Sequence, residues 1–483
     1  MDNKIIQSTK WSGITELLSK LILPVINLFL ARILSPEVFG VVATFTMVTT
    51  FAEIFTDAGF SKYLVQHEFR DDDDKNLSTQ TAFWTNIIFS IAVWGIVFLF
   101  RYQIASLVGS EGYETEIAVM SLTIPMVSFA SIQLALYRRN FRFRELLPIR
   151  FTTCLVPLIV TLPLALLLRN CWALIIGTLA KEAVNLILLT VKSDWKPKMK
   201  YSFGKLKEML SFSLIIMADT FVIWLTSYAG TFIISNVLSS YYIGIYKTGI
   251  STINAYISIF YTITAPVLFA GLSRVQDDDR ECKNIYGAFQ HYASFLVLPL
   301  GVGIFVFRDF VTDILLGSQW GDASLLLGGM GLALSVSIVT AQYNSDYFRA
   351  KGKPYLSLAV QSIFTILMIV VLKIFVNRSF EVLSMARVVI SFAYPIISCI
   401  AINIFLKVSI FSIVKNVFWP GLASALMGAF GWFLRSLKVG MLWDVLFVLA
   451  CIVFYALILL AIPYTRKELL SLQKVKNVLR RSR

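Results

Sequence analysis

The chain has 483 residues, of which 57% are hydrophobic and only 15% charged, a composition outside the range of soluble domains. Its two histidines and five scattered cysteines exclude a histidine-based metal centre and a disulfide framework. The net charge of +14 requires an anionic partner or an anionic surface, and the position of the charge along the chain decides between them.

Long apolar stretches follow one another along the whole chain. About 20 apolar residues span a bilayer as a helix. The stretches are continuously apolar rather than alternating, which excludes a membrane β-barrel. The sequence therefore predicts an all-α polytopic membrane protein of about fourteen transmembrane helices. They cover residues 11–33, 39–62, 80–100, 117–137, 149–168, 171–191, 209–233, 243–272, 285–307, 324–346, 355–376, 381–405, 414–434 and 441–463.

The basic residues lie mostly on one side of the predicted membrane. When the loops are assigned alternately to the two sides, most of the 43 Lys and Arg residues fall on the side of the N-terminus. Such a bias marks the cytoplasmic side, so both termini are expected in the cytoplasm. The positive charge is then explained by topology and contact with anionic lipids, and nucleic-acid binding is not expected.

The sequence contains one membrane unit twice. Residues 34–41 (LSPEVFGV) return loosely as residues 238–245 (LSSYYIGI), an offset of 204. Further matching pairs keep the same order, with an offset that rises only to 210. They are the acidic turns 71–74 and 277–279, Phe100-Arg101 and Phe307-Arg308, residues 107–110 and 315–318, and residues 137–139 and 347–349. Two homologous helical bundles in one membrane chain are typical of a transporter that binds its substrate between the halves.

This duplication predicts the domain organisation. Each unit has six spans, so the two units keep one orientation and are related by an axis along the membrane normal. The predicted parts are an N-terminal lobe over 1–191, a cytoplasmic linker over 192–208, a C-terminal lobe over 209–406, two additional helices over 407–463 and a basic cytoplasmic tail over 464–483.

Motifs in the first hundred residues resemble a known family. Residues 30–40 (LARILSPEVFG), residues 57–61 (DAGFS) and residues 82–84 (AFW) are similar to the bacterial polysaccharide transporter family, the Wzx-like lipid-linked oligosaccharide flippases of the multidrug/oligosaccharidyl-lipid/polysaccharide superfamily. The resemblance implies two lobes around a central cavity that opens alternately to cytoplasm and periplasm. It implies location in the bacterial inner membrane and an undecaprenyl-diphosphate-linked oligosaccharide as cargo, for O-antigen, capsule or exopolysaccharide synthesis. A polysaccharide polymerase or chain-length protein is an expected partner of the monomer.

Charged residues inside predicted spans are the candidate site residues, because each costs roughly 2.5–3.5 kcal/mol on insertion. We expect the basic ones to face the cavity and neutralise a diphosphate or acidic sugars; they are Lys20, Lys181, Lys247 and Arg387. The acidic ones are candidates for binding a coupling proton or Na⁺; they are Glu16, Glu53, Asp57 and Asp219. The alternative is that these residues form ion pairs within or between helices that hold the bundle, while Lys247, Arg387 and Asp57 simply lie near the membrane interfaces.

A second basic group, Arg138, Arg139 and Arg142, follows the fourth span. It can guide an anionic headgroup to a lateral entrance, or it can only enforce topology. No cofactor beyond a coupling ion is expected.

Two other functions are compatible with the fold. An ion-coupled exporter of drugs or small solutes from the same superfamily predicts a more apolar or acidic cavity, whereas the deep lysines favour an anion. A membrane polysaccharide polymerase or ligase predicts a large external loop with acid–base residues, and the predicted external loops are short. The sequence therefore favours a flippase without covalent chemistry.

Overall fold

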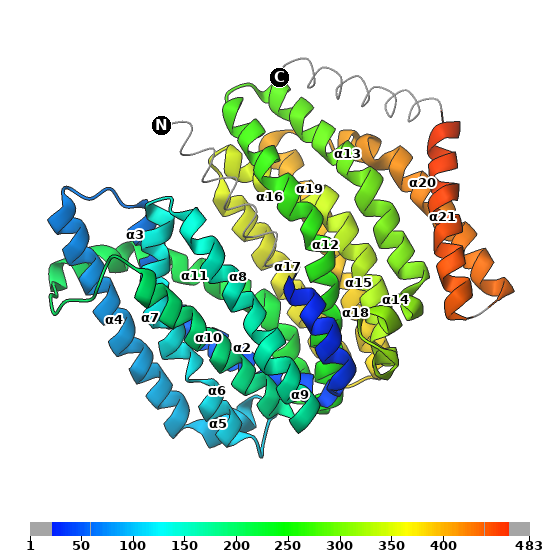
Figure 1. Ribbon diagram of the computed structural model, residues 1–483. Coiled ribbons are helices and arrows are strands. Elements are labelled where there is room, and N and C mark those ends of the chain that lie inside the picture. Colours follow the sequence, from blue (N-terminus) through cyan, green and yellow to red (C-terminus); the bar gives the residue numbers. More distant parts are fainter. Residues whose placement is uncertain (1–21, 58, 439, 463–483) are drawn as a thin grey trace. The chain divides into compact units, whose positions relative to one another are not determined.

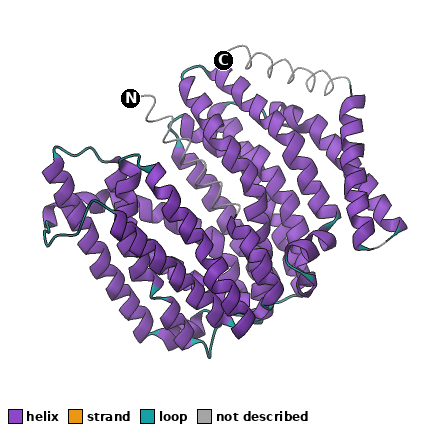
Figure 2. Cartoon of the chain, viewed as in Figure 1, coloured by secondary structure: helices purple, strands orange, loops and turns teal. Residues whose placement is uncertain are grey.

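The computed structural model describes residues 22–57, 59–438 and 440–462 (Figure 1). Every regular element in these residues is a helix, as Figure 2 shows. Within the described residues, thirteen helical stretches, some made of two or more consecutive helices, are long and apolar enough to cross a membrane, and Ile22–Ile33 is a shorter apolar helix within the first predicted span. The predicted all-α polytopic membrane fold is confirmed. Helices are the expected solution, because they satisfy every backbone hydrogen bond internally where no water is available.

Contacts divide the chain into two units. The first comprises Met1–Thr248 and Leu372–Arg378, and the second Gly249–Val371 and Ser379–Arg483. The lobe boundaries predicted from the duplication differ from this division and stay a prediction.

The first unit contains the elements from α2 to the beginning of α12. They are α2 (Pro36–Asp57), α3 (Phe60–Gln66), α4 (Asp72–Leu99), α5 (Arg101–Leu107), α6 (Glu114–Met120), α7 (Thr123–Arg139), α8 (Phe143–Val156), the π-helix η1 (Pro157–Thr161), α9 (Leu162–Leu168), α10 (Cys171–Lys192), α11 (Phe203–Ser235) and α12 (Ser240–Arg274). One apolar core joins α2, α5, α6 and α10 around side chains such as Phe45 and Ile117.

The second unit contains the rest of α12 and the later elements. They are α13 (Asp279–Val306), α14 (Arg308–Leu315), the 3₁₀-helix η2 (Ser318–Ala323), α15 (Ser324–Ser337), the π-helix η3 (Ile338–Gln342), α16 (Tyr343–Ala350), α17 (Pro354–Phe375), α18 (Phe380–Ser391), α19 (Ala393–Leu406), α20 (Ile410–Leu437) and α21 (Met441–Ala461). Here α13 packs along α15 and α20, and Phe307 and Phe447 lie in a core shared with α21.

The duplicated motifs have the same local structures in both copies. The acidic turns are helix caps: Asp71 accepts a hydrogen bond from the backbone of Asp74 at the start of α4, and Asp278 accepts from Arg280 and Glu281 at the start of α13. Aspartate suits this position because its carboxylate satisfies unpaired N–H groups and the positive end of the helix dipole. The repeated acidic residues therefore start a helix in each copy.

The same agreement holds at the other end of these helices. Phe100 and Phe307 each separate a long helix from a short one, with φ near −100° in both. The glycine of each following turn, Gly109 and Gly317, has a positive φ of 65° or 104°. Such a conformation strains any residue with a Cβ atom. The sequence repeat is thus a repeat of structure.

Two glycines of the repeat contact each other's helix. A Cβ atom on Gly40 of α2 lies 1.8 Å from the carbonyl oxygen of Ser240, and one on Gly244 of α12 lies 1.8 Å from that of Pro36. The contact is reciprocal, because both pairs differ by the repeat offset of 204. The backbones of α2 and α12 therefore cross in direct contact, which small residues permit in membrane helices.

The linker, here residues 193–202, lies along α4. The Gln80 side chain donates to the carbonyl of Lys196 at 3.2 Å and accepts from the backbone of Lys198 at 2.7 Å, while the indole N–H of Trp84 donates to the carbonyl of Lys198 at 2.8 Å. Helix α11 begins at Phe203 with Ser202 as its cap, within the predicted linker range of 192–208, which stays a prediction.

Candidate functional site

Aromatic side chains form a ladder on one face of α11. Phe221, Trp224 and Tyr228 are spaced by three and four residues, which places them on one side of a helix. The Phe221 and Trp224 ring centroids are 6.3 Å apart, and those of Trp224 and Tyr228 are 5.7 Å apart, both pairs stacked. Phe51 of α2 packs on Trp224 with centroids 4.8 Å apart. We call these four residues the aromatic ladder.

Hydrogen bonds to α2 fix the middle of the aromatic ladder. The indole N–H of Trp224 points to the Thr50 hydroxyl at 3.2 Å and to the Met47 carbonyl at 3.3 Å. A partly buried indole needs such an acceptor, and the bond determines how its ring is turned. Tyr228 also interacts with Thr50. The ladder is therefore held by polar contacts as well as by stacking.

Charged residues flank the last ring of the ladder. The Lys247 ammonium donates to the Ser227 carbonyl at 2.9 Å and lies 3.7 Å from the centroid of the Tyr228 ring. An ammonium over an aromatic face is attracted by the ring's negative quadrupole. The charge of Glu53 on α2 acts on the same tyrosine. Of the residues predicted from the sequence, Lys247 therefore contacts the ladder, and Glu53 acts on the same tyrosine through its charge.

The aromatic ladder is not among the residues predicted from the sequence, which were chosen by charge. The signal was present, because residues 221, 224 and 228 fall on one helical face within the predicted span 209–233. The sequence does not indicate that Trp224 contacts Met47 and Thr50 of α2, which are 177 and 174 positions away in the chain.

The remaining predicted basic residues of the spans have local partners. Lys181 forms an ion pair with the adjacent Glu182 at 2.8 Å. Arg387 of α18, in the second unit, is 7% exposed and donates to the Ser391 hydroxyl of the same helix. The Lys181 contact is an ion pair within one helix, as the alternative expects, whereas the Arg387 contact is a hydrogen bond within its helix. A cavity role for Lys181 and Arg387 stays a prediction.

Other predicted residues are less well defined. Asp219 of α11 is partly buried and has no hydrogen-bond or ion-pair partner among the described residues. Glu16 and Lys20 lie outside the described residues, as does the side chain of Asp57.

The arginines after the fourth span make structural contacts. Arg139 donates to the carbonyls of Leu64 and His67 at 2.8 and 2.7 Å, and so caps the end of α3. Arg142 is paired with Glu145 and Asp194, and these pairs raise its pKa further above the usual arginine range. Arg138 is exposed at the end of α7. A headgroup role for the three arginines stays a prediction.

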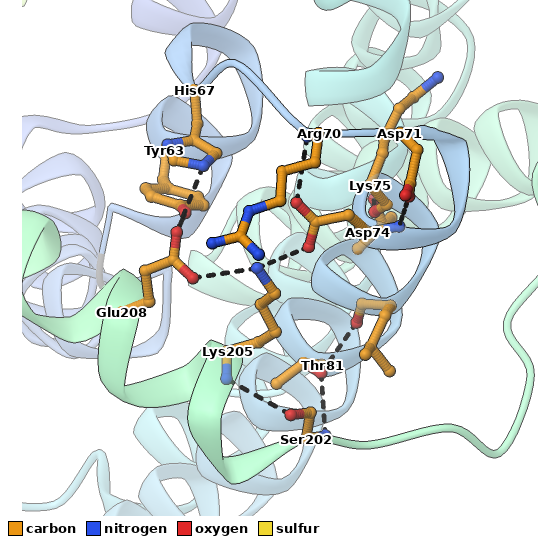
Figure 3. A network of polar contacts seen from close by, with 12 residues as sticks. Tyr63, His67, Arg70, Asp71, Asp74, Lys75, Thr81, Ser202, Lys205 and Glu208 are labelled. Atoms are coloured by element: carbon orange, nitrogen blue, oxygen red, sulfur yellow. Dashed lines mark hydrogen bonds and ion pairs between the residues drawn. The ribbon is translucent and has the colours of Figure 1, made fainter.

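A polar cluster ties the beginning of α11 to α3 and α4 (Figure 3). Glu208 accepts from the Tyr63 hydroxyl at 2.9 Å and from Lys205 at 3.0 Å, and Lys205 also pairs with Asp74 at 2.5 Å. His67 approaches Glu208 at 3.3 Å. The bonds from Lys205 and Tyr63 lower the pKa of Glu208, and the Asp74 carboxylate raises the pKa of Lys205. These contacts hold the linker end against the first acidic turn.

The residues of this candidate site fall within a region that matches a known protein family. A model of the family described as polysaccharide biosynthesis protein matches residues 29–325, which include the aromatic ladder, Lys247 and the polar cluster. The chain belongs to this family. The match confirms the resemblance to bacterial polysaccharide transporters that the motifs of residues 30–84 suggest.

Three relatives of this polysaccharide biosynthesis protein agree with the assignment. An uncharacterized membrane protein in the cps region of Klebsiella pneumoniae is 24% identical over 66% of this chain and 65% of its own length. The succinoglycan biosynthesis transport protein ExoT of Rhizobium meliloti is 26% identical over 64% and 62%. The lipopolysaccharide biosynthesis protein WzxC of Escherichia coli is 21% identical over 66% and 64%. The chain therefore spans just under two thirds of each relative.

Solved structures show that the fold of this polysaccharide biosynthesis protein is shared with transporters. The lipid II flippase MurJ in an inward closed conformation superposes with a TM-score of 0.75 and 14% identity, over 95% of this chain and 100% of that chain. An inward-facing multidrug resistance MATE transporter of the MOP superfamily gives 0.57 and 13%, over 85% and 98%. In the described part of the chain, no three His, Cys, Asp or Glu side chains are grouped so as to hold a metal ion.

Proposed function

We propose that this protein is a flippase that carries an undecaprenyl-diphosphate-linked oligosaccharide across the bacterial inner membrane for surface polysaccharide synthesis. The family match supports a role in polysaccharide biosynthesis, and one relative bears the name of a transport protein. The aromatic ladder with Lys247 is the structural observation that carries the proposal for this chain.

The cargo sets two physical requirements. A diphosphate is strongly disfavoured in the hydrocarbon region, which is about 30 Å thick, unless the protein supplies a compensating positive charge. Lys247 supplies an ammonium, which binds phosphate as a point charge. A sugar ring has an apolar face, formed by its C–H groups, and a polar edge. Rigid aromatic rings are suited to the face, and the ladder offers three stacked rings on α11.

Transport then needs no covalent step. We propose that the two homologous lobes expose the cargo alternately to cytoplasm and periplasm, with both termini in the cytoplasm and the polyprenyl tail remaining in lipid. Glu53, which acts on the same tyrosine as Lys247, is our candidate for binding the coupling proton or Na⁺. A polymerase or chain-length protein is expected to receive the exported unit.

The first experiment tests the cargo. Deletion of the gene should abolish the surface polymer and trap full-length lipid-linked repeat units on the cytoplasmic side, where mass spectrometry identifies them. Unchanged polymer without trapped intermediates, in a strain without redundant flippases, would contradict the proposal. Sensitivity of that strain to drugs would then support the exporter alternative.

The second experiment tests the site. Complementation with Lys247→Ala should restore little polymer, and Lys247→Arg should restore much more because it keeps the charge. Lys373→Ala is the matched control, since it removes an exposed lysine near the end of α17. Equal polymer with Lys247→Ala and wild type, at equal protein level, would exclude Lys247 from the site.

Two variants of Trp224 test the role of the aromatic ladder. Trp224→Ala removes both the ring and the bond to Thr50, whereas Trp224→Phe keeps a ring without the bond. We expect transport to follow the ring, so that the phenylalanine variant retains most activity. Trp432→Ala, at a residue that is 64% exposed on α20, is the control for loss of a tryptophan. Loss of activity in Trp224→Phe equal to that in Trp224→Ala would mean that the bond, and not stacking with cargo, matters.

A further inference from the structure

A cavity of about 270 Å³ lies where the start of α4, the end of α7 and the linker meet. These elements lie side by side in the first unit (Figure 1). The polar and aromatic residues that line it include Lys75, Asn76, Asn140, Arg142, Asp194 and Trp195. None of them belongs to the aromatic ladder, so the cavity is separate from the site proposed for cargo.

The walls of the cavity are held in place by contacts of their own. The Tyr137 hydroxyl donates to the Lys192 carbonyl at 2.7 Å, and Arg142 joins α8 to the linker through Glu145 and Asp194. The Trp195 ring packs edge-on against Phe83 of α4, with centroids 5.4 Å apart. The cavity is therefore preformed, and a ligand need not order it.

Three side chains that line the cavity can donate hydrogen bonds to a ligand. Among the described residues, nothing hydrogen-bonds to the side-chain amides of Asn76 and Asn140. The Lys75 ammonium forms a 3.6 Å ion pair with Asp72, whose side chain is 93% exposed, and has no other ion pair within the described part of the chain; such surface pairs contribute little. One ammonium and two amides make a binding set for an oxyanion, with a charge-assisted bond from the lysine.

The volume of the cavity and the residues around it indicate which kind of anion it can bind. Pockets for drug-sized ligands measure roughly 300–1,000 Å³, so this cavity is too small for an oligosaccharide unit and matches a group the size of phosphoglycerol. Tyr137 and Trp195 are the aromatic types found at membrane interfaces. Lys192, Lys196 and Lys198 continue along the linker, and such basic segments attract anionic lipids of the cytoplasmic leaflet.

We propose that this cavity binds the phosphate headgroup of an anionic glycerophospholipid, with Lys75 pairing with the phosphate and Asn76 and Asn140 donating to its oxygens. The lipid is a bound structural ligand and not the cargo. It connects the linker, α4 and α7 to the membrane surface, so its binding stabilises the docked linker.

Native mass spectrometry of the purified full-length protein tests this proposal. After delipidation, the protein is titrated with phosphatidylglycerol, phosphatidylethanolamine, glycerol 3-phosphate and inorganic phosphate. We expect one tightly held phosphatidylglycerol, and a loss of affinity of about tenfold or more in Lys75→Gln/Asn140→Leu. Lys62→Gln, which removes an exposed lysine from α3, should leave the affinity unchanged.

Three results would overturn the proposal. Equal lipid retention by the double variant and wild type would place the lipid elsewhere. An equal loss in Lys62→Gln would show attraction by net charge alone. Saturation by glycerol 3-phosphate or phosphate, with no lipid retained, would assign the cavity to a soluble anion. The melting temperature of lipid-free Lys75→Gln/Asn140→Leu, compared with that of lipid-free wild type, shows whether the double variant is folded. If it is not folded, the same titrations are made with Lys75→Gln alone.

Discussion

The two copies of the duplicated unit begin alike and differ where their second helices end. In the first copy α2 ends at Asp57, Gly59 has a φ of 75°, and the chain restarts as the short helix α3. In the second copy α12 runs unbroken for 35 residues, through Pro266. A helix break leaves carbonyl groups that need donors. The first copy therefore has an additional helix end, at Asp57, where the second copy continues as one helix.

Equivalent arginines also make different contacts in the two copies. Arg139 of the first copy caps the end of α3. Its counterpart Arg349 pairs instead with the buried Asp346 at 2.6 Å and contacts the Tyr261 hydroxyl of α12 at 3.3 Å. One repeated position thus stabilises a helix end in one copy and a buried carboxylate in the other. The two copies thus share their helix caps and the glycines of the α2–α12 crossing, whereas the contacts of their equivalent arginines differ.

The acidic turns diverged in the same way. In the first acidic turn Asp74 pairs with Lys205 from the beginning of α11, whereas in the second acidic turn Asp279 pairs with Lys351, just after α16 of its own copy, at 2.5 Å. The first turn is therefore part of the docking of the linker. The following predictions test which contacts the two copies share and which they do not.

The reciprocal glycine crossing should be the most sensitive shared feature. Gly40→Ala and Gly244→Ala each place a methyl group against a backbone carbonyl that cannot move independently of its helix. We expect each to cost at least about 3 kcal/mol, the upper end for overpacking, and to lower the melting temperature in detergent or abolish folding. Gly95→Ala of α4, where a Cβ meets nothing within 4 Å, should be neutral or stabilising. A large difference between Gly40→Ala and Gly244→Ala would contradict the reciprocity.

Arg349→Gln should be the next most damaging change. It leaves the Asp346 carboxylate, 3% exposed, without its counter-charge, so we expect a cost of about 3 kcal/mol in thermal or denaturant unfolding. Asp346→Asn should cost less, because the side chain of Arg349 is 49% exposed and remains hydrated. The double variant should be more stable than Arg349→Gln alone. Additive losses would show that the two residues are not coupled.

Arg139→Gln should have a smaller and more local effect. It removes charge-assisted hydrogen bonds to the end of α3, worth about 1.5–3 kcal/mol where they are buried and less where water reaches the carbonyls. Hydrogen exchange should increase in residues 60–67 and remain unchanged in α16. Protection lost equally in both copies would indicate global destabilisation instead.

The polar cluster around Glu208 should contribute least, and in a pH-dependent way. The pKa of Glu208 is lowered in the folded protein, so its contribution is complete above the ordinary glutamate range and is lost as pH falls through the lowered pKa. The side chain is 42% exposed, so we expect less than about 1 kcal/mol.

Melting temperatures measure this contribution. Wild type should exceed Glu208→Gln at pH 6 and above, and the gap should close in acid. Because His67 also faces Glu208, the comparison is repeated with His67→Gln in both proteins. A difference in melting temperature between wild type and Glu208→Gln that grows as the pH falls would contradict this prediction.

Some residues of the proposed site could be predicted from the sequence and others could not. Lys247 and Glu53 were identified because a charge within an apolar span is costly. Their common neighbour Tyr228 was missed, because an aromatic residue in a membrane helix carries no such signal. The alternative explanation of an ion pair fits Lys181, whose partner Glu182 is adjacent in the chain.

The sequence by itself determined the membrane helices, their caps and the duplication, because these depend on local composition: apolar length makes a span, aspartate starts a helix, and glycine permits a positive φ. Only the tertiary structure decided that Gly40 meets Gly244, that the linker lies on α4 and that Trp224 binds α2. These contacts join residues far apart in the chain, and they depend on which face each helix turns toward its neighbour. In a helix that is apolar on all sides, the hydrophobic pattern does not specify that face.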